Sequence, residues 1–281
     1  MLYFLTGTTG SGKSKIAHQI AINRDIKILS LDSMSVYKNL DILSDKPTKS
    51  MQKEVQYFGL NIVEESMNFS VFDYLSYLSE IGLDKLSHKE DIIAVGGTGL
   101  YFNAIVNQYN LRKTDKEYRE YLESLDLNTL QCMFNASLDS ETHIDTKNKR
   151  RLIRALESNN KDKSKNKLNF KIPNKKLGIF WDNPDAKLNI KNRTETMFNS
   201  GLVDEVNNLN NPNRTIRQAI GFNAIVDMHD NQGVIEEINN KTYKLVKKQK
   251  TWFKKIENIL YLKTNQDYII RSNMEKLFNE R

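Results

Sequence analysis

Apolar runs and helical periodicity alternate along the first hundred residues of the chain. Short apolar runs of the kind that form buried strands stand at 2–6, 26–31 and 92–95. Apolar positions three or four residues apart predict helices at 15–23 and 72–86. Strands that alternate with helices at this spacing favour right-handed βαβ units and a parallel sheet.

The pattern changes in the second half of the chain. Between 112 and 157 apolar positions such as Leu122 and Leu130 keep helical spacing without a strand pattern, which predicts an all-helical insertion. The stretch 158–169 is polar and rich in lysine, which predicts a loop. Apolar runs predict two further strands at 177–181 and 259–262. Helical periodicity predicts helices at 185–199, 202–209, 218–228 and 234–253, and a helix at the C-terminus.

Composition narrows the class of protein. The chain has 281 residues, 39% of them hydrophobic, which suits one large domain or a core with a modest insertion. No apolar stretch of about 18 residues occurs, so we expect no membrane span, and no secretory signal is recognisable. The single cysteine, Cys132, excludes an intrachain disulfide and fits a reducing, cytoplasmic compartment.

The net charge of +7 is unevenly distributed. From 145 to 176 there are twelve Lys or Arg residues against three acidic ones, and from 241 to 255 there are seven lysines and no acid. Such runs are commonly solvated helix faces. Basic surface also binds polyanions through counterion release, so the charge leaves nucleic acid open as a partner.

The segment from 7 to 14 lies between the first predicted strand and the first predicted helix. Its pattern is G-x-x-x-x-G-K-S, in which glycines let backbone N–H groups surround phosphate oxygens at a helix N-terminus. Lys13 can reach the outer phosphate, and the Ser14 hydroxyl can hold a magnesium ion. We therefore predict Mg²⁺ as cofactor and a diphosphate- or triphosphate-binding site, ATP included, formed by Gly7, Thr8, Thr9, Gly10, Ser11, Gly12, Lys13 and Ser14.

The strand pattern and this P-loop together predict the fold class. We expect an α/β fold, a P-loop NTPase-like parallel sheet flanked by helices, with a small all-helical insertion. The core is predicted to comprise residues 1–111 and 159–281, and the insertion residues 112–158.

Two further segments follow predicted strands at the same edge of the sheet. Asp32 follows the second strand and should lie beside the P-loop. Its carboxylate could hold magnesium through water, accept a proton, or cap the next segment. After the third strand come Gly96, Gly97 and Thr98, where a hydrolytic P-loop enzyme usually has an acidic residue. This favours a transferase whose loop surrounds an organic substrate, although a glycine-rich helix entry would give the same pattern.

Six blocks span nearly the whole chain in the order found in the tRNA dimethylallyltransferase family, which the chain resembles: GTTGSGKS, DSMSVY, GGTGLY, KRRLIRALE, QAIGF and KQKTWF. The P-loop alone is shared by many enzymes, whereas DSMSVY followed by GGTGLY is far more selective. The resemblance implies transfer of a dimethylallyl group from its diphosphate to N6 of the adenosine 3′ of the anticodon, with release of diphosphate. The implied partners are dimethylallyl diphosphate and the tRNA anticodon stem-loop. We expect no membrane partner, and we expect a monomer.

The resemblance also implies residue roles. Asp32 would be the general base that takes the N6 proton, and Thr98 would position the amine and Asp32. The P-loop with a Ser14-bound magnesium ion would hold the departing diphosphate, on which charge grows as the allylic C–O bond breaks. Arg217, or else Arg214, would contact the diphosphate, unless it is only a surface arginine. The implied contacts to the flipped adenosine and its tRNA are Ser33, Met34, Tyr37, Gly96, Gly97, Tyr101, Arg150, Arg151, Gln218, Lys248, Gln249 and Trp252.

The chain departs from the family pattern in places that leave alternatives open. Ser35 stands where the family usually has Gln, and 56–60 reads QYFGL in place of a Pro-His-His-Leu segment. These departures motivate a tRNA-binding protein without chemistry as one alternative. The others are a P-loop small-molecule kinase and an adenylate isopentenyltransferase that acts on AMP or ATP. The basic runs and the missing acid after Val95 favour the tRNA-modifying transferase. Trp252 is predicted to be a core residue or a platform for base stacking.

Overall fold

The computed structural model describes the whole chain except residues 109–114, 138–143, 160–167, 169, 229 and 281. The described residues form two compact units, and each is considered by itself. The larger unit comprises Met1–Gln108 and Lys171–Arg281, and the smaller unit lies within Tyr109–Phe170. The smaller unit thus extends to 170, whereas the sequence pattern placed the end of the insertion at 158.

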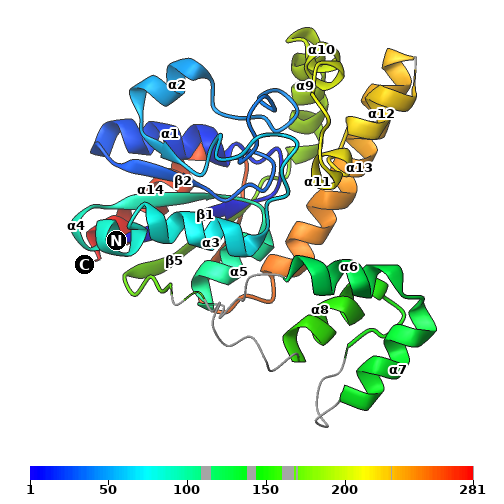
Figure 1. Ribbon diagram of the computed structural model, residues 1–281. Helices are drawn as coiled ribbons and strands as arrows, with labels where there is room; N and C mark the ends of the chain where they lie inside the picture. Colours follow the sequence, from blue (N-terminus) through cyan, green and yellow to red (C-terminus); the bar gives the residue numbers. More distant parts are fainter. Residues whose placement is uncertain (109–114, 138–143, 160–167, 169, 229, 281) are drawn as a thin grey trace. The chain divides into compact units, whose positions relative to one another are not determined.

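A six-stranded sheet with the order β3-β2-β4-β1-β5-β6 forms the centre of the larger unit (Figure 1). Each neighbouring pair of these strands is parallel. This confirms the predicted α/β class with a parallel sheet flanked by helices. The strands are β1 (Leu2–Gly7), β2 (Lys27–Ser30), β3 (Tyr57–Phe58), β4 (Ile92–Gly96), β5 (Lys175–Asp182) and β6 (Leu260–Lys263).

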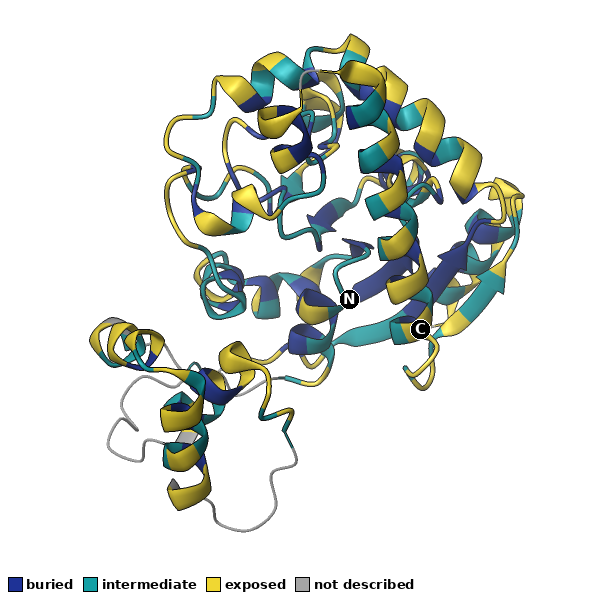
Figure 2. Ribbon diagram, turned by 90° about the vertical axis from the view of Figure 1, so that its right-hand side faces the viewer, coloured by how far each residue is buried: buried dark blue, intermediate teal, exposed yellow. Residues whose placement is uncertain are grey.

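The central strand β1 is buried on both faces, and alternate residues serve opposite layers of helices. Tyr3 packs on Phe278 of α14 (Asp267–Asn279), in a cluster that includes residues of α1 (Lys13–Arg24). Phe4 points to the other face and meets Phe102 of α5 (Gly99–Val106) with ring centroids 5.0 Å apart. The strands other than β6, whose two end residues are exposed, are buried or half-buried, and the outward faces of the surrounding helices are exposed (Figure 2). Helices therefore cover both faces of the sheet, as a continuous apolar strand requires.

One predicted helix is divided at a glycine, and another begins later than predicted because of one. The predicted helix 72–86 is α3 (Val71–Glu80) and α4 (Leu83–Lys89), separated at Gly82 with φ 66°. The predicted helix 218–228 begins only at Phe222, because Gly221 with φ 102° lies between α11 (Arg214–Arg217) and α12 (Phe222–Asp227). The remaining helices of this unit are α2 (Lys49–Glu54), which was not predicted, α9 (Ala186–Asn199), α10 (Leu202–Asn207) and α13 (Asn231–Phe253).

The smaller unit consists of α6 (Lys116–Ser124), α7 (Leu127–Ser137) and α8 (Lys149–Asn159) in its described residues. Its own apolar core contains Leu122, Leu130, Phe134, Leu152, Ile153 and Leu156. An ion pair between Arg119 and Glu157, 3.3 Å apart, joins α6 to α8. Cys132 is exposed on α7. In the described part of the whole chain, no helix combines the length and apolar character needed to cross a membrane.

Candidate active site

The phosphate-binding loop connects β1 to α1 and takes its shape from two glycines. Gly10 and Gly12 have φ values of 77° and 95°, in the left-handed region that side chains disfavour. A Cβ on Gly10 would lie 2.9 Å from Ile190 Cγ1, so the loop also needs the missing side chain for space. Because α1 begins at Lys13, the loop ends at a helix N-terminus, where free N–H groups attract anions.

Side chains outside the loop hold its carbonyl oxygens. Asn189 Nδ2 of α9 donates to Gly10 O at 2.9 Å, and Asn183 Nδ2 donates to Ser11 O at 3.1 Å. These contacts occupy the acceptors of the loop with amide donors from elsewhere in the chain. The carbonyl oxygens of Gly10 and Ser11 therefore point to these donors and not toward a bound anion. Neither asparagine was predicted to take part.

The loop borders a cavity of about 520 Å³. Thr9 and Lys13 line one part of it, and side chains of the second and third predicted site segments line another, among them Asp32 and Thr98. A smaller cavity of about 90 Å³ shares Lys13 and Asp32 and adds Ser14. The structure therefore brings together the three segments that the sequence singled out.

Lys13 lies among groups of both charge signs. Its Nζ donates to Thr8 O at 3.3 Å. Burial lowers the pKa of Lys13 to about 8, opposed by the carboxylate of Asp32 and reinforced by the guanidinium of Arg193. An anion bound beside Lys13 would favour the charged amine and raise its pKa again. The lowered pKa thus reflects mainly the burial of the amine, which the carboxylates of Asp32 and Asp45 only partly offset.

Arg193 of α9 is the described arginine that lines both cavities beside Lys13. Its Nη1 lies 3.3 Å from Asp45 Oδ2, and its buried Nε has no hydrogen-bond partner in the described structure. Arg217 was predicted to contact the diphosphate, but it is exposed and its Nε donates to Pro212 O at 2.8 Å. Neither Arg217 nor Arg214 lines these cavities. The sequence offered no local signal for Arg193, because it lies in a helix far along the chain from the P-loop.

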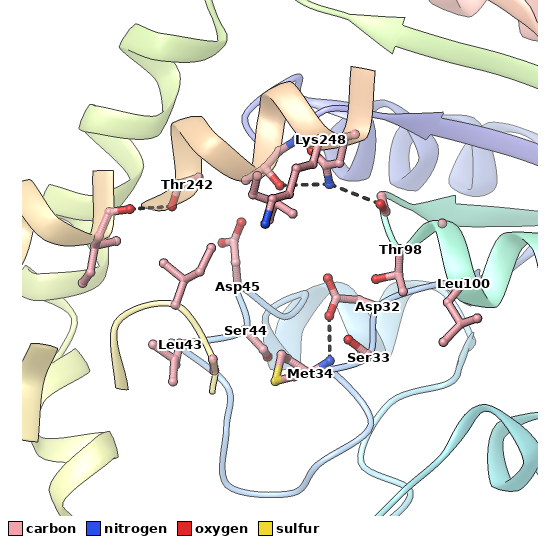
Figure 3. Close-up of a pocket in the computed structure, with 18 of the residues that line it drawn as sticks. Asp32, Ser33, Met34, Leu43, Ser44, Asp45, Thr98, Leu100, Thr242 and Lys248 are labelled. Carbon is pink, nitrogen blue, oxygen red and sulfur yellow. Dashed lines mark hydrogen bonds between the residues drawn. The ribbon is translucent and has the colours of Figure 1, made fainter. Parts of the chain in front are cut away.

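Asp32 stands at the end of β2, two residues after the last strand position. Its Oδ1 accepts a hydrogen bond from Met34 N at 2.7 Å, so one carboxylate oxygen shapes the turn that follows. The side chain also faces the cavity with Ser33 and Met34, as Figure 3 shows. The carboxylate therefore makes a local turn contact and also lines the cavity, and its roles toward magnesium or a proton stay predictions.

Thr98, at the position that precedes α5, lines the same cavity as Asp32, and the two side chains are neighbours in Figure 3. The backbone of Thr98 accepts from Phe102 N, but its side chain makes no capping hydrogen bond to the helix. The hydroxyl is therefore available to a ligand in the cavity. Gly97 and Gly99 flank it, and a Cβ on Gly99 would lie 2.7 Å from the indole of Trp252. Trp252 thus both covers the loop and lines the cavity.

Other residues predicted to contact tRNA fall into separate groups. Gln218 and the exposed Lys248 line the cavity. Tyr37 and Tyr101 do not line it: both are buried, and Tyr101 stacks on Tyr74 with ring centroids 4.0 Å apart. These two tyrosines are therefore core residues, and their spacing after each strand signalled packing.

The remaining predicted contacts lie in different places. Gly96 lines the smaller cavity, but its Cβ would lie 2.5 Å from Leu31 O, so it is needed for the close approach of β4 to the chain after β2. Gln249 also lines the larger cavity, but it is buried and uses its side-chain amide within the protein. Arg150 and Arg151 are exposed on α8 of the smaller unit.

The fold and the cavity define an α/β P-loop protein whose phosphate-binding loop faces a carboxylate across a shared cavity. The family model described as IPP transferase matches residues 35–256. A tRNA dimethylallyltransferase of Methylacidiphilum infernorum is 30% identical, over 98% of this chain and 91% of the relative. One of Thermoanaerobacter sp. is 34% identical, over 90% of this chain and 88% of the relative.

Solved structures give the same result. The crystal structure of full-length tRNA isopentenylpyrophosphate transferase from Bacillus halodurans has a TM-score of 0.67 and 26% identity, and the match covers 98% of this chain and 93% of that one. The chain belongs to the IPP transferase family, that of the tRNA dimethylallyltransferases. This confirms the family predicted from the six sequence blocks, and with it a prenyltransferase.

Proposed function

We propose that this chain transfers a dimethylallyl group from dimethylallyl diphosphate to N6 of the adenosine 3′ of the anticodon in tRNA. One observation carries the proposal: a single cavity combines a phosphate-binding loop, the Asp32 carboxylate and an apolar wall that includes Leu43, Met197 and Ile238. The loop suits the diphosphate of the donor, the apolar wall suits its hydrocarbon chain, and the carboxylate suits the amine of the acceptor. Family membership supports the same reaction.

The donor end of the site stabilises the leaving group. As the bond between C1 of the allyl group and the diphosphate oxygen breaks, negative charge grows on the diphosphate. The N–H groups at the start of α1, the Lys13 ammonium and the Arg193 guanidinium are fixed donors that interact more strongly with this charge than with the intact ester. The chain therefore needs no ATP hydrolysis to drive the transfer.

The residues present also fit a magnesium ion. The hydroxyl of Ser14 and the carboxylates of Asp32 and Asp45 line the smaller cavity, and oxygen is the donor that magnesium prefers. Magnesium binds through few protein oxygens and completes its shell with phosphate oxygens and water, so Ser14 is the residue that would hold it, and Asp32 stays available as the base. When bound, it would neutralise part of the charge on the departing diphosphate.

The acceptor end of the site makes the N6 amine reactive. The C1–N6 bond forms as the C1–O bond breaks, and the carboxylate of Asp32 takes the proton that N6 loses. The Thr98 hydroxyl, free of the helix cap, is placed to orient the amine toward Asp32. Atoms and charge balance, because diphosphate leaves with the electron pair of the C–O bond and Asp32 carries the proton.

A tRNA acceptor fits the charge of the chain. The target base must leave the anticodon stack to reach the cavity, where Trp252 offers an aromatic surface and Lys248 a cation. Lysines of α13 and the exposed Arg150 and Arg151 of α8 supply cations for phosphate contacts, which position an RNA without reading its sequence.

Incubation of the protein with dimethylallyl diphosphate, magnesium and an anticodon stem-loop RNA tests the proposal. We expect mass spectrometry to show addition of one C5H8 unit at the adenosine 3′ of the anticodon, and none on an RNA with guanosine there. Modification of AMP at a higher kcat/KM than the RNA would instead identify an adenylate isopentenyltransferase. Phosphorylation of a small acceptor from ATP would identify a kinase.

A further inference from the structure

Gln249 stands near the end of α13 and is 7% exposed. The sequence resemblance implied that it contacts tRNA, but its side-chain amide is used inside the protein. Oε1 accepts a hydrogen bond from Thr9 N at 2.9 Å, and Nε2 donates to Gly97 O at 3.2 Å. One amide thus joins the P-loop to the loop that carries Thr98.

The two loops that Gln249 joins follow neighbouring strands. β1 leads into the P-loop, β4 leads into the Gly97 loop, and the two strands pair directly in the sheet. The P-loop holds the donor diphosphate in the proposed reaction, whereas the Gly97 loop presents Thr98 to the acceptor. The amide therefore links the loop proposed to hold the donor to the loop proposed to present the acceptor.

The position of Gln249 is itself fixed by the apolar core. Phe253, one helical turn later, stacks on Phe180 of β5 with centroids 4.6 Å apart and meets Phe102 of α5. Trp252 lies against Gly99. The end of α13 therefore packs on both β5 and α5. This packing fixes the position of the Gln249 amide relative to the two loops that it contacts.

Gly97 and the side-chain amide of Gln249 approach each other closely. A Cβ on Gly97 would lie 2.3 Å from Gln249 Nε2. The Gly97 carbonyl is therefore turned toward α13, and the planar trans peptide turns the N–H of Thr98 to the opposite side. Loss of the Nε2 donor would free this peptide to rotate and would change the direction of the Thr98 side chain.

We propose that Gln249 is a positioning residue that sets the distance between the donor and acceptor loops through the hydrogen bonds of its amide to Thr9 and Gly97. This inference rests on the proposed prenyl transfer for its effect on rate. The rate of a two-substrate reaction depends steeply on alignment, and a displacement of about 1 Å lowers it by about 10²-fold. Gln249 does not need to touch either substrate to have this effect.

Three variants test the role. Gln249→Leu keeps the approximate volume and removes all three hydrogen bonds of the side-chain amide, two to Thr9 and one to Gly97. Gln249→Glu keeps the acceptor for Thr9 N but places a second carboxylate oxygen against Gly97 O. The matched control is Asn239→Leu, because Asn239 is a buried amide of the same helix whose Oδ1 accepts from Thr194 Oγ1 at 2.8 Å, away from both loops.

We expect Gln249→Leu to lower kcat by about 10²-fold, with a much smaller change in the KM of each substrate. Asn239→Leu should lower the melting temperature and leave kcat per folded molecule unchanged. Gln249→Glu should regain activity relative to wild type as the pH falls, because a protonated carboxyl can donate to Gly97 O as the amide does. Its buried carboxyl should titrate above the usual value of about 4.3, within reach of the assay.

Amide hydrogen exchange separates this inference from the proposed function. Gln249→Leu should speed exchange at the amide of Thr9 and in the Gly97 loop together, whether or not the protein prenylates RNA. Equal exchange at Thr9 in variant and wild type, or an unchanged kcat, would overturn the role of Gln249. A wild-type protein that adds no C5H8 unit to any anticodon stem-loop overturns the proposed function, while the exchange result still decides how the loops are held.

Discussion

Donor binding should weaken as the pH rises above about 8, and Lys13 is the reason. Its pKa falls from 10.5 to about 8 because the amine is buried, despite the opposing carboxylate of Asp32. A bound diphosphate favours the charged amine, so above pH 8 binding must be accompanied by uptake of one proton. By linkage, the donor dissociation constant should then rise about tenfold for each pH unit.

The structure sets the size of the effect. If the diphosphate restores the pKa of Lys13 to its usual 10.5, the difference from about 8 corresponds to about 3 kcal/mol of binding free energy lost at high pH. The same shift affects stability in the opposite sense. Between pH 8 and 10.5 the unfolded chain binds more protons than the folded one, so the free energy of unfolding of the free protein rises with pH across that window.

Isothermal titration with dimethylallyl diphosphate and magnesium between pH 7.5 and 9.5 measures the effect. A terminal phosphate with a pKa of about 6 is ionised throughout this range, so titration of the ligand contributes little to the pH dependence of binding. Heats in buffers of different ionisation enthalpy report the proton uptake. Lys13→Met should bind weakly at every pH, without the slope, and should raise the melting temperature because a buried amine is gone. A constant affinity in the wild type, or the same slope in Lys13→Met, would refute the reasoning.

Three further changes test separate parts of the site. Asp32→Asn keeps the acceptor for Met34 N but removes the base, so single-turnover prenylation should slow by about 10²–10⁴-fold with donor affinity retained, and near-normal turnover would exclude Asp32 as the base. Gly10→Ala should cost about 1–3 kcal/mol in calorimetric unfolding and weaken donor binding, because φ is 77° and Ile190 is 2.9 Å away, and an unchanged melting temperature would contradict this. Arg193→Gln should raise the donor dissociation constant by about tenfold or more and Arg217→Gln should leave it nearly unchanged, and the reverse ranking would restore Arg217 as the diphosphate ligand.

The parts of the site that could be predicted are motifs whose residues lie close together in the sequence. The P-loop needs glycines, a lysine and a hydroxyl residue at fixed spacing between a strand and a helix, and all of these requirements are local. Asp32 and Thr98 could be placed because each ends a strand, and parallel strands end at one edge of the sheet. Local pattern and topology together therefore predicted both sides of the cavity.

The residues that sequence reasoning missed act over long distances. Arg193 and Asn189 reach the P-loop from α9, and Gln249, which was predicted only as a tRNA contact, reaches it from α13, each about 180 residues or more along the chain. Nothing in the spacing around them marks the contact, because a polar residue on an amphipathic helix is usually solvated. The predicted start of the helix at 218–228 was wrong for a different reason. Gly221 interrupts a periodic apolar pattern that helix propensity alone would allow to continue.

The position of the carboxylate argues for transfer over hydrolysis. A hydrolytic P-loop enzyme holds an acidic residue at the end of the strand that here ends in Gly96, and Gly96 lies so close to Leu31 O that any Cβ would clash. The close approach thus leaves no side chain at this point to orient a water molecule. The carboxylate that faces the cavity instead follows β2, with Thr98 in the same cavity and the apolar wall nearby. An amine of an organic acceptor can be deprotonated from there, whereas the strand end at Gly96 offers no carboxylate to a water molecule.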